Sequence, residues 1–460
     1  MEASDFELRF FPSACNRPKE HILNYLRAVA LLAVAAPLYA QYGGPAVLTR
    51  GQAPAAMAAS QIDFRPVLSV TGGYDSGLNG VGVDPNGRPF NVSSYTVEAT
   101  AGVSGVHSWR HTLIGLDYSA SVRHFTGASF YDGFDQRLLL NITHQLSRHV
   151  MFTVRTSAGL FTQNFQSWSL QQTVAFDPAT TYVPTNDFYD NRTRYVSTQG
   201  ELHVQKSTRL SYSLGGDVFA TRRRSSALYG STGGGARGDL QYRLSRRSTI
   251  GGAYSYIHYS FAKIFSSTDL HTMVGSYAIR LNRAAEFSGI LGATRYETKF
   301  IQTVPVDPAI AALIGISNIN QISYARKWLA SGKGRLSYTM KRGVVFVSGG
   351  RAVTPGNGVF LTSTTTSATV GYSYTALKRW SASANAGYNQ STSLGNFRGD
   401  YGNYNANINV SRQVARFTHA VLTLHARKYA SNDFNAYNMW SYGVRLGLGF
   451  APGELPLRLW

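Results

Sequence analysis

One feature constrains the fold of this chain more than any other: from Phe64 onward, apolar and polar residues alternate within segments of roughly 10 to 15 residues. Successive side chains of a β-strand point to opposite faces. Such alternation therefore predicts strands with one apolar and one polar face. The clearest examples are residues 114–123, 380–389, 404–411 and 441–450. The chain is therefore expected to be all-β.

The connections between these segments come in two kinds. Short basic turns, such as Ser245-Arg246-Arg247 and Lys341-Arg342-Gly343, alternate with longer loops rich in Gly, Asn, Asp and Pro. Short turns on one side and long loops on the other are typical of a transmembrane antiparallel up-and-down β-barrel. We expect an even number of strands, about 18 within a range of 16–20. The expected starts lie near residues 64, 92, 111, 134, 150, 194, 209, 231, 248, 268, 285, 321, 343, 358, 379, 400, 416 and 436.

Composition agrees with a barrel and excludes several other classes of protein. Charged residues make up 15% of the chain, against about 25% in a typical soluble protein. After residue 40 there is no unbroken apolar stretch of about 18 residues, which excludes a helical membrane protein. An aromatic content of 13% excludes an intrinsically disordered chain. A soluble sandwich or propeller is the alternative, but many apolar strand positions hold Ala or Gly, which are too small for an interlocking core.

The N-terminus has the pattern of an export signal. Residues 28–36 read AVALLAVAA, follow Lys19 and Arg27, and precede Ala40 and Gln41. A basic segment, a short apolar segment and a small residue before a polar one are typical of a secretory signal peptide. We expect a signal peptide over 1–40, a periplasmic Ala/Pro/Gly linker over 41–63, the barrel over 64–450 and a periplasmic tail over 451–460. The single cysteine, Cys15, would leave with the signal peptide, so no disulfide is expected.

The net charge is +20, from 44 Lys and Arg minus 24 Asp and Glu. The basic residues are spread singly along the chain, so nucleic-acid binding is not expected. On the polar face of the strands, basic residues outnumber acidic ones. The basic residues expected to line a lumen are Arg123, Arg137, Arg155, Arg237, Arg243, Arg280, Lys333, Arg335, Arg427 and Arg445. The acidic ones are Glu98, Asp117, Glu201, Asp217 and Asp239.

Two readings of this wall remain open. An excess of fixed positive charge in a confined pore favours anions. Alternatively, Asp117, Asp217 and Asp239 pair with neighbouring Arg side chains and leave a braced, nearly neutral wall. Aromatic residues near the long loops, among them Tyr259 and Tyr296, predict a girdle at the level of the lipid headgroups.

The signal peptide, the hairpin repeat and the last strand, residues 442–450, resemble those of bacterial outer-membrane porin-like barrels. The resemblance is greatest to poorly characterised β-barrel porin families, some of them linked to exopolysaccharide loci. It implies an outer-membrane location, contact with lipid and lipopolysaccharide, and insertion by the barrel-assembly machinery. Such families end the last strand in an aromatic residue that this machinery reads. Phe450 has the right phase, but ten residues follow, so the terminal Trp460 is a second candidate.

These observations predict a channel for passive diffusion of small hydrophilic solutes, with a mild preference for anions. An outer-membrane component of exopolysaccharide export, or a structural barrel, is the alternative, because a basic lumen suits an acidic polysaccharide as well as small anions. An outer-membrane hydrolase is less supported, because no nucleophile-elbow sequence is present. No cofactor or metal is expected, because the His residues show no ligand spacing. The loops Gln163–Asn191 and Lys299–Ser317 are the candidates for closing the lumen from within.

Overall fold

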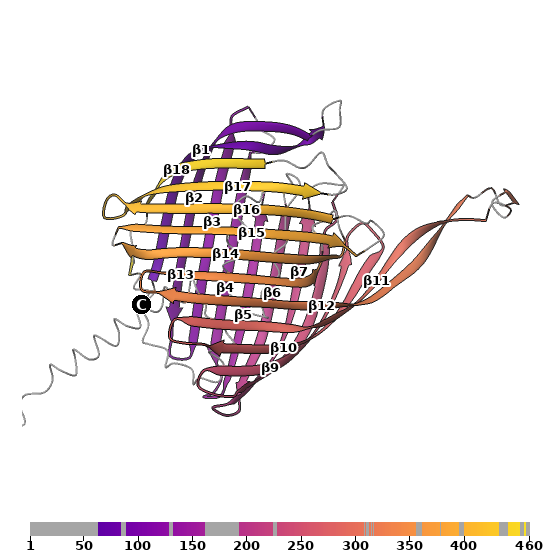
Figure 1. The fold of residues 1–460 in the computed structure, drawn as a ribbon, viewed down its shortest axis with the longest axis horizontal. Helices are drawn as coiled ribbons and strands as arrows, with labels where there is room; N and C mark the ends of the chain where they lie inside the picture. The colour runs from indigo at the N-terminus through magenta and orange to yellow at the C-terminus, as the bar shows by residue number, and fades with distance from the viewer. Residues whose placement is uncertain are drawn as a thin grey trace, which may run out of the picture. The chain divides into compact units, whose positions relative to one another are not determined.

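The computed structural model describes residues 63–83, 89–127, 132–161, 193–223, 228–307, 309, 312–313, 315, 317–355, 361–377, 379–394, 400–431, 440–450 and 455–456. Long strands make up nearly all of this part of the chain (Figure 1). They are β1 (Asp63–Val83), β2 (Pro89–Ser108), β3 (Thr112–Phe125), β4 (Gly133–Gln145), β5 (Val150–Phe161), β6 (Thr193–Gln205), β7 (Leu210–Arg223), β8 (Ser231–Arg243), β9 (Ser248–Phe261), β10 (Ser266–Arg280), β11 (Ala285–Pro305), β12 (Asn318–Met340), β13 (Gly343–Thr354), β14 (Ser363–Leu377), β15 (Trp380–Ser393), β16 (Asp400–Gln413), β17 (Thr418–Ser431), β18 (Trp440–Phe450) and the short β19 (Leu455–Pro456).

The strands β1 to β18 form one closed antiparallel barrel. Each strand pairs with the next along the chain, and β18 pairs with β1 from Leu68↔Phe450 to Asp75↔Gly443. The two-residue β19 pairs with the first residues of β1. The predicted all-β fold and the predicted count of strands are confirmed, and each of the eighteen strands begins within five residues of its expected start. Among the described residues, no helix has the length and apolar character needed to cross a membrane.

The outer face of the barrel is apolar. Large apolar side chains such as Val70, Leu214 and Leu446 are each at least 58% exposed on it. In β18 the exposed positions are Trp440, Tyr442, Val444, Leu446, Leu448 and Phe450, which is the alternate set that the sequence indicates. A closed ring of strands has no unpaired edge, so its backbone hydrogen bonds are all made within the barrel, as a lipid environment requires. Its apolar outer face also suits contact with lipid. The fold is therefore the transmembrane up-and-down barrel that the sequence predicts.

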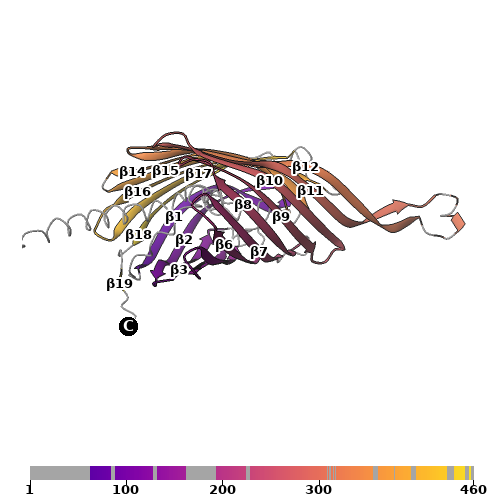
Figure 2. The ribbon, with the colours of Figure 1, turned by 90° about the horizontal axis from the view of Figure 1, so that it is seen from below.

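One hairpin extends far beyond the others. Pairing of β11 with β10 ends at Phe300, and pairing of β12 with β13 begins only at Gly332. Between these points β11 and β12 continue as a two-stranded ribbon, up to Pro305↔Asn318, that projects from the barrel (Figures 1 and 2). Its side chains are mostly exposed, including Ile319 and Tyr324.

Candidate functional site

The inner face of the barrel collects the polar positions of all strands. Cross-strand partners lie on the same face of a sheet, so pairs such as Glu98↔Arg123 and Gly215↔Arg237 place their members together. This face points to the inside of the barrel. Tyr259 of β9 lies on it and donates a hydrogen bond to Thr362, the residue before β14, which is five strands away around the ring. Followed around the ring, the register puts on this face all fifteen residues named above as lumen-lining: Arg123, Arg137, Arg155, Arg237, Arg243, Arg280, Lys333, Arg335, Arg427, Arg445, Glu98, Asp117, Glu201, Asp217 and Asp239.

A buried ionic cluster crosses the seam where the last strand meets the first. Arg445 Nη1 donates to Glu98 Oε2 at 2.7 Å, and Arg445 Nη2 donates to Asp75 Oδ2 at 3.3 Å. Arg123 Nε donates to the same Glu98 oxygen at 3.3 Å, and His425 Nε2 lies 2.9 Å from Asp75 Oδ1. These side chains come from β17, β18, β1, β2 and β3, so the cluster braces the closure of the ring from inside. We call Asp75, Glu98, Arg123, His425 and Arg445 the seam cluster.

Further ion pairs hold other inner side chains. Arg237 Nη2 donates to Glu201 Oε2 at 2.9 Å, and Arg280 Nε donates to Glu286 Oε1 at 2.8 Å. Asp239 accepts a hydrogen bond from Ser213. The acids in the described ion pairs of the inner wall include Glu98, Asp135, Glu201 and Glu286.

Sequence reasoning missed three inner acids. Asp135 and Glu286 stand at inward positions opposite Ser121 and Arg280, and a stricter count of alternate positions would have found both. Asp75 lies among Gly and Asn residues, a composition typical of a loop. The structure instead continues β1 to Val83 and buries Asp75 to 1% exposure.

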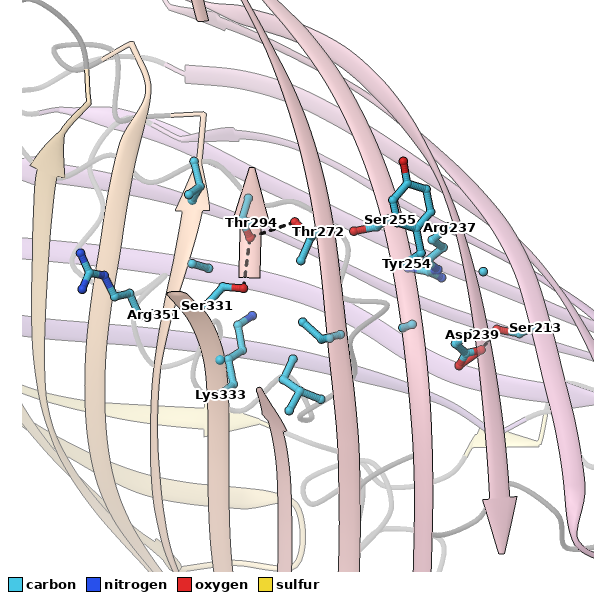
Figure 3. Close-up of a pocket in the computed structure, with 17 residues that line it drawn as sticks. Ser213, Arg237, Asp239, Tyr254, Ser255, Thr272, Thr294, Ser331, Lys333 and Arg351 are labelled. Carbon is cyan, nitrogen blue, oxygen red and sulfur yellow. Dashed lines mark hydrogen bonds between the residues drawn. The ribbon is translucent and has the colours of Figure 1, made fainter. Parts of the chain in front are cut away.

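A groove of about 160 Å³ follows the inner wall from β7 to β13 (Figure 3). Its floor carries three hydroxyls in series: Thr272 and Thr294 are 3.0 Å apart, and Thr294 donates to Ser331 at 3.1 Å. Arg237 and Lys333 border the groove. The groove therefore presents hydroxyl groups and positive charge to the inside of the barrel.

An apolar cluster narrows the inside of the barrel towards the long loops. Its buried members are Phe219, Tyr259, Phe261, Leu270 and Tyr296, and Leu361 and Leu394 pack against it. Thr362 lies 3.2 Å from the Tyr259 hydroxyl and 2.9 Å from the Thr268 hydroxyl. The segment before β14 is therefore fastened to the wall formed by β9 and β10. The expectation that Tyr259 and Tyr296 form an outer girdle is wrong, because both rings point inward and are covered.

The two loops expected to close the lumen have different outcomes. Of Lys299–Ser317, residues 299–305 belong to β11, and this hairpin projects away from the barrel (Figure 2). That expectation is corrected: strand pairing continues past the rim because the β-branched residues of 300–304 and 319–322 suit an extended ribbon. Gln163–Asn191 falls outside the described residues. The inward segment is instead Leu361–Thr362, for which loop composition gave no signal.

The proposed assembly signal lies at the end of the last strand. Phe450 is the final residue of β18, pairs with Leu68 and Thr418, and meets the Phe417 ring edge-on at 6.3 Å between centroids. Trp460 falls outside the described residues.

We expect Phe450→Ala to lower the amount of folded barrel in cells, because it removes the aromatic residue in strand phase that the assembly machinery is proposed to read. The measurement is the folded fraction on an unheated gel, with Leu448→Ala, on the same outer face two residues earlier, as the control. Equal losses in the two variants would mean that only outer-face packing matters. A normal amount of Phe450→Ala together with a loss on changing Trp460 would transfer the signal to the terminus.

Comparisons with known proteins concern the fold. No family model and no curated protein matches the chain. Similar solved structures include OccK5 (OpdH) of Pseudomonas aeruginosa, with 12% identity, a TM-score of 0.39 and coverage of 85% of this chain and 99% of that one. OccK2 (OpdF) of the same organism, in complex with glucuronate, has 10% identity, a TM-score of 0.42 and coverage of 85% and 99%. A BenF-like porin from Pseudomonas fluorescens Pf-5 has 10% identity, a TM-score of 0.43 and coverage of 87% and 100%.

Proposed function

We propose that this protein is an outer-membrane channel through which small hydrophilic solutes diffuse passively, with a mild preference for anions. The observation that carries the proposal is the division of the barrel into an apolar outer face and an inner face of polar and charged side chains. Eighteen strands are enough to enclose an aqueous lumen. Nothing in the proposal calls for catalysis by the barrel.

The proposed anion preference rests on the positively charged side chains of the inner wall that form no ion pair with a described residue. Arg123, Arg237 and Arg445 are each matched by a carboxylate. Within the described part of the chain, Arg137 and Lys333 make no ion pair, and both stand at inward positions. Fixed positive charge in a narrow pore raises the local concentration of anions. The carboxylates nearby keep the expected preference mild.

The test is the single-channel conductance of the refolded chain in a planar bilayer, with the reversal potential measured across a KCl gradient. We expect steady openings and a reversal potential displaced towards that of chloride. A barrel that is folded, as judged by its mobility on an unheated gel, but passes no current would overturn the channel proposal.

Charge reversal of Arg137 tests the preference itself. We expect Arg137→Glu to move the reversal potential towards that of potassium, because it replaces an inward positive charge with a negative one. The displacement should shrink as salt rises, since the screening length falls from about 10 Å at 0.1 M to about 3 Å at 1 M. The matched control is Arg247→Glu, in the exposed turn after β8. If both variants have the wild-type reversal potential, the inner wall does not select by charge.

A further inference from the structure

The inner wall formed by β14, β15 and β16 differs in chemistry from the rest of the barrel. At the described positions of these strands, the charged residues are Asp400 and Arg412. Asp400 stands opposite Thr392, and Arg412 stands opposite Trp380 and Ala420, so both lie on the outer face. The inward positions of the three strands hold no Asp, Glu, His, Lys or Arg. They carry hydroxyl and amide side chains, which we call the amide–hydroxyl wall: Ser363, Thr365, Ser367, Thr369, Ser373, Ser381, Ser383, Asn385, Asn389, Ser391, Asn403, Asn405, Asn407, Asn409 and Ser411.

These side chains form a grid rather than scattered points. Asn385 stands opposite Asn407, and Asn389 stands opposite Asn403. On the next rows, Asn405 Nδ2 donates to Asn403 Oδ1 at 3.5 Å, and Asn409 Oδ1 accepts from Thr423 at 2.9 Å. A ladder of amides therefore runs along β16, with hydroxyls beside it on β14 and β15.

Two polar atoms of this grid have no hydrogen-bond partner among the described residues. Asn403 is fully buried, yet its Nδ2 has no hydrogen-bond partner among the described residues, and the same holds for Asn407 Oδ1. One atom is a donor and the other an acceptor. Buried polar atoms of this kind are normally satisfied, so the donor and the acceptor call for partners beyond the described residues, while the less buried amides and hydroxyls of the same wall face the inside of the barrel.

The opposite wall has the contrary character. Nine strands away around the ring of eighteen lie β5, β6 and β7, which carry Arg155, Glu201 and Asp217 at inward positions. Figure 1 shows β14 to β16 in front of the barrel and β4 to β7 behind them. A solute in the barrel therefore meets a charged wall on one side and a neutral wall of donors and acceptors on the other.

A neutral wall with paired donors and acceptors suits a particular kind of solute. The hydroxyl groups of a saccharide both donate and accept hydrogen bonds. They recur at short intervals along the molecule. Such a wall has no net charge, so it adds no preference between cations and anions. Many weak hydrogen bonds also meet the requirement of a channel, since binding must be favourable enough for entry and weak enough for release.

We propose that the amide–hydroxyl wall is a binding track for neutral polyhydroxylated solutes, that is, small saccharides. The proposal rests on the proposed channel function and adds a substrate class to it. The track would run on the side of the barrel away from the charged residues of β5 to β7.

The experiment measures block of the single-channel current in KCl by the neutral trisaccharide maltotriose. The test variant is N385L/N407L, which replaces two facing amides with side chains of similar shape that cannot hydrogen-bond. The matched control is Asn141→Leu, the same change at an inward position of β4, opposite Arg155. A polyethylene glycol of similar size is the second control solute, because its ether oxygens accept hydrogen bonds but only its ends donate.

We expect maltotriose to block the wild-type channel with saturation and the glycol not to saturate. N385L/N407L should weaken the block about tenfold, the effect of losing two ordinary hydrogen bonds, and Asn141→Leu should leave it unchanged. Equal block in wild type and N385L/N407L would overturn the track, and so would equal loss in the two variants. Mobility on an unheated gel confirms that each variant is folded.

A second readout separates failure of the track from failure of the channel. Saturation-transfer NMR detects weak maltotriose binding to the refolded protein in detergent and needs no current. A silent barrel that binds maltotriose through Asn385 and Asn407 would remove the channel proposal and keep the track. A conducting barrel with neither block nor saturation transfer would remove the track and keep the channel.

Discussion

Replacing Arg445 with Met is expected to destabilise the barrel by about 3–5 kcal/mol, the usual cost of removing one partner of a buried ion pair. The Arg445 side chain is 5% exposed, and its guanidinium is shared between Glu98 and Asp75. Without it, two carboxylates that are almost fully buried lose the positive charge they share, although Arg123 and His425 still contact them. The measurement is the free energy of unfolding of the refolded barrel in urea.

The control for Arg445→Met is Arg243→Met, another inward Arg. Among the described residues, Arg243 donates to the carbonyls of Ser245 and Arg246 in the adjoining turn and makes no ion pair, so its loss should cost within about 0.5 kcal/mol. Similar losses in the two variants would show that the seam cluster does not stabilise closure of the ring. Recovery of part of the stability in Arg445→Lys, which keeps the charge but not the two-pronged geometry, would support the ion pairs as the cause.

The second large effect is expected at Tyr259. This ring is fully buried, packs edge-on against Phe261 at 5.5 Å between centroids, and donates to Thr362. Tyr259→Ala should cost about 3–5 kcal/mol, as for truncation of other buried aromatic rings. It should also loosen the attachment of Leu361 and Thr362 to the wall, which then depends on the hydrogen bond between Thr362 and Thr268, and we therefore expect a larger single-channel conductance.

Two variants separate the effect of Thr362 from that of simple truncation. Tyr259→Phe keeps the ring and removes only the hydrogen bond, so its conductance should stay close to wild type. Tyr195→Ala removes another buried inner ring, on β6, whose hydroxyl bonds to Ser157 rather than to the segment before β14. Equal conductance gains from Tyr259→Ala and Tyr195→Ala would mean that lost volume, and not release of the segment, widens the barrel.

Strand positions and faces could be predicted because they depend on local alternation. Apolar and polar residues alternate with a period of two within each strand, and the short basic turns mark every second hairpin. The inward positions of Arg123 and Glu98 follow from counting alone. Their ion pairs do not, since Asp75 and Arg445 meet from positions 370 residues apart, and only closure of the ring brings them together.

The internal cluster around Tyr259 was missed for a different reason. In a barrel with a polar inside, alternation assigns large aromatic rings to the lipid side, and Tyr259 and Tyr296 break this rule. They are tolerated inside because Leu361, Thr362 and Leu394 cover them. A segment that folds inward leaves no periodic signal in its own residues, so neither the cover nor the covered rings can be recognised in advance.

The length of the β11–β12 ribbon can change without changing the strand pairing that closes the barrel. In the described part of the chain, its residues beyond Phe300 and before Gly332 share no strand pairing with β10 or β13, and Leu313 near its tip is 86% exposed. Extra residues at the tip would leave all the pairings that close the barrel unchanged. We expect the linker and the tail in the periplasm, and the β11–β12 tip lies at the opposite end of the barrel from the start of β1 and the end of β18, so this hairpin is a suitable fusion point for displaying foreign peptides on a bacterial surface.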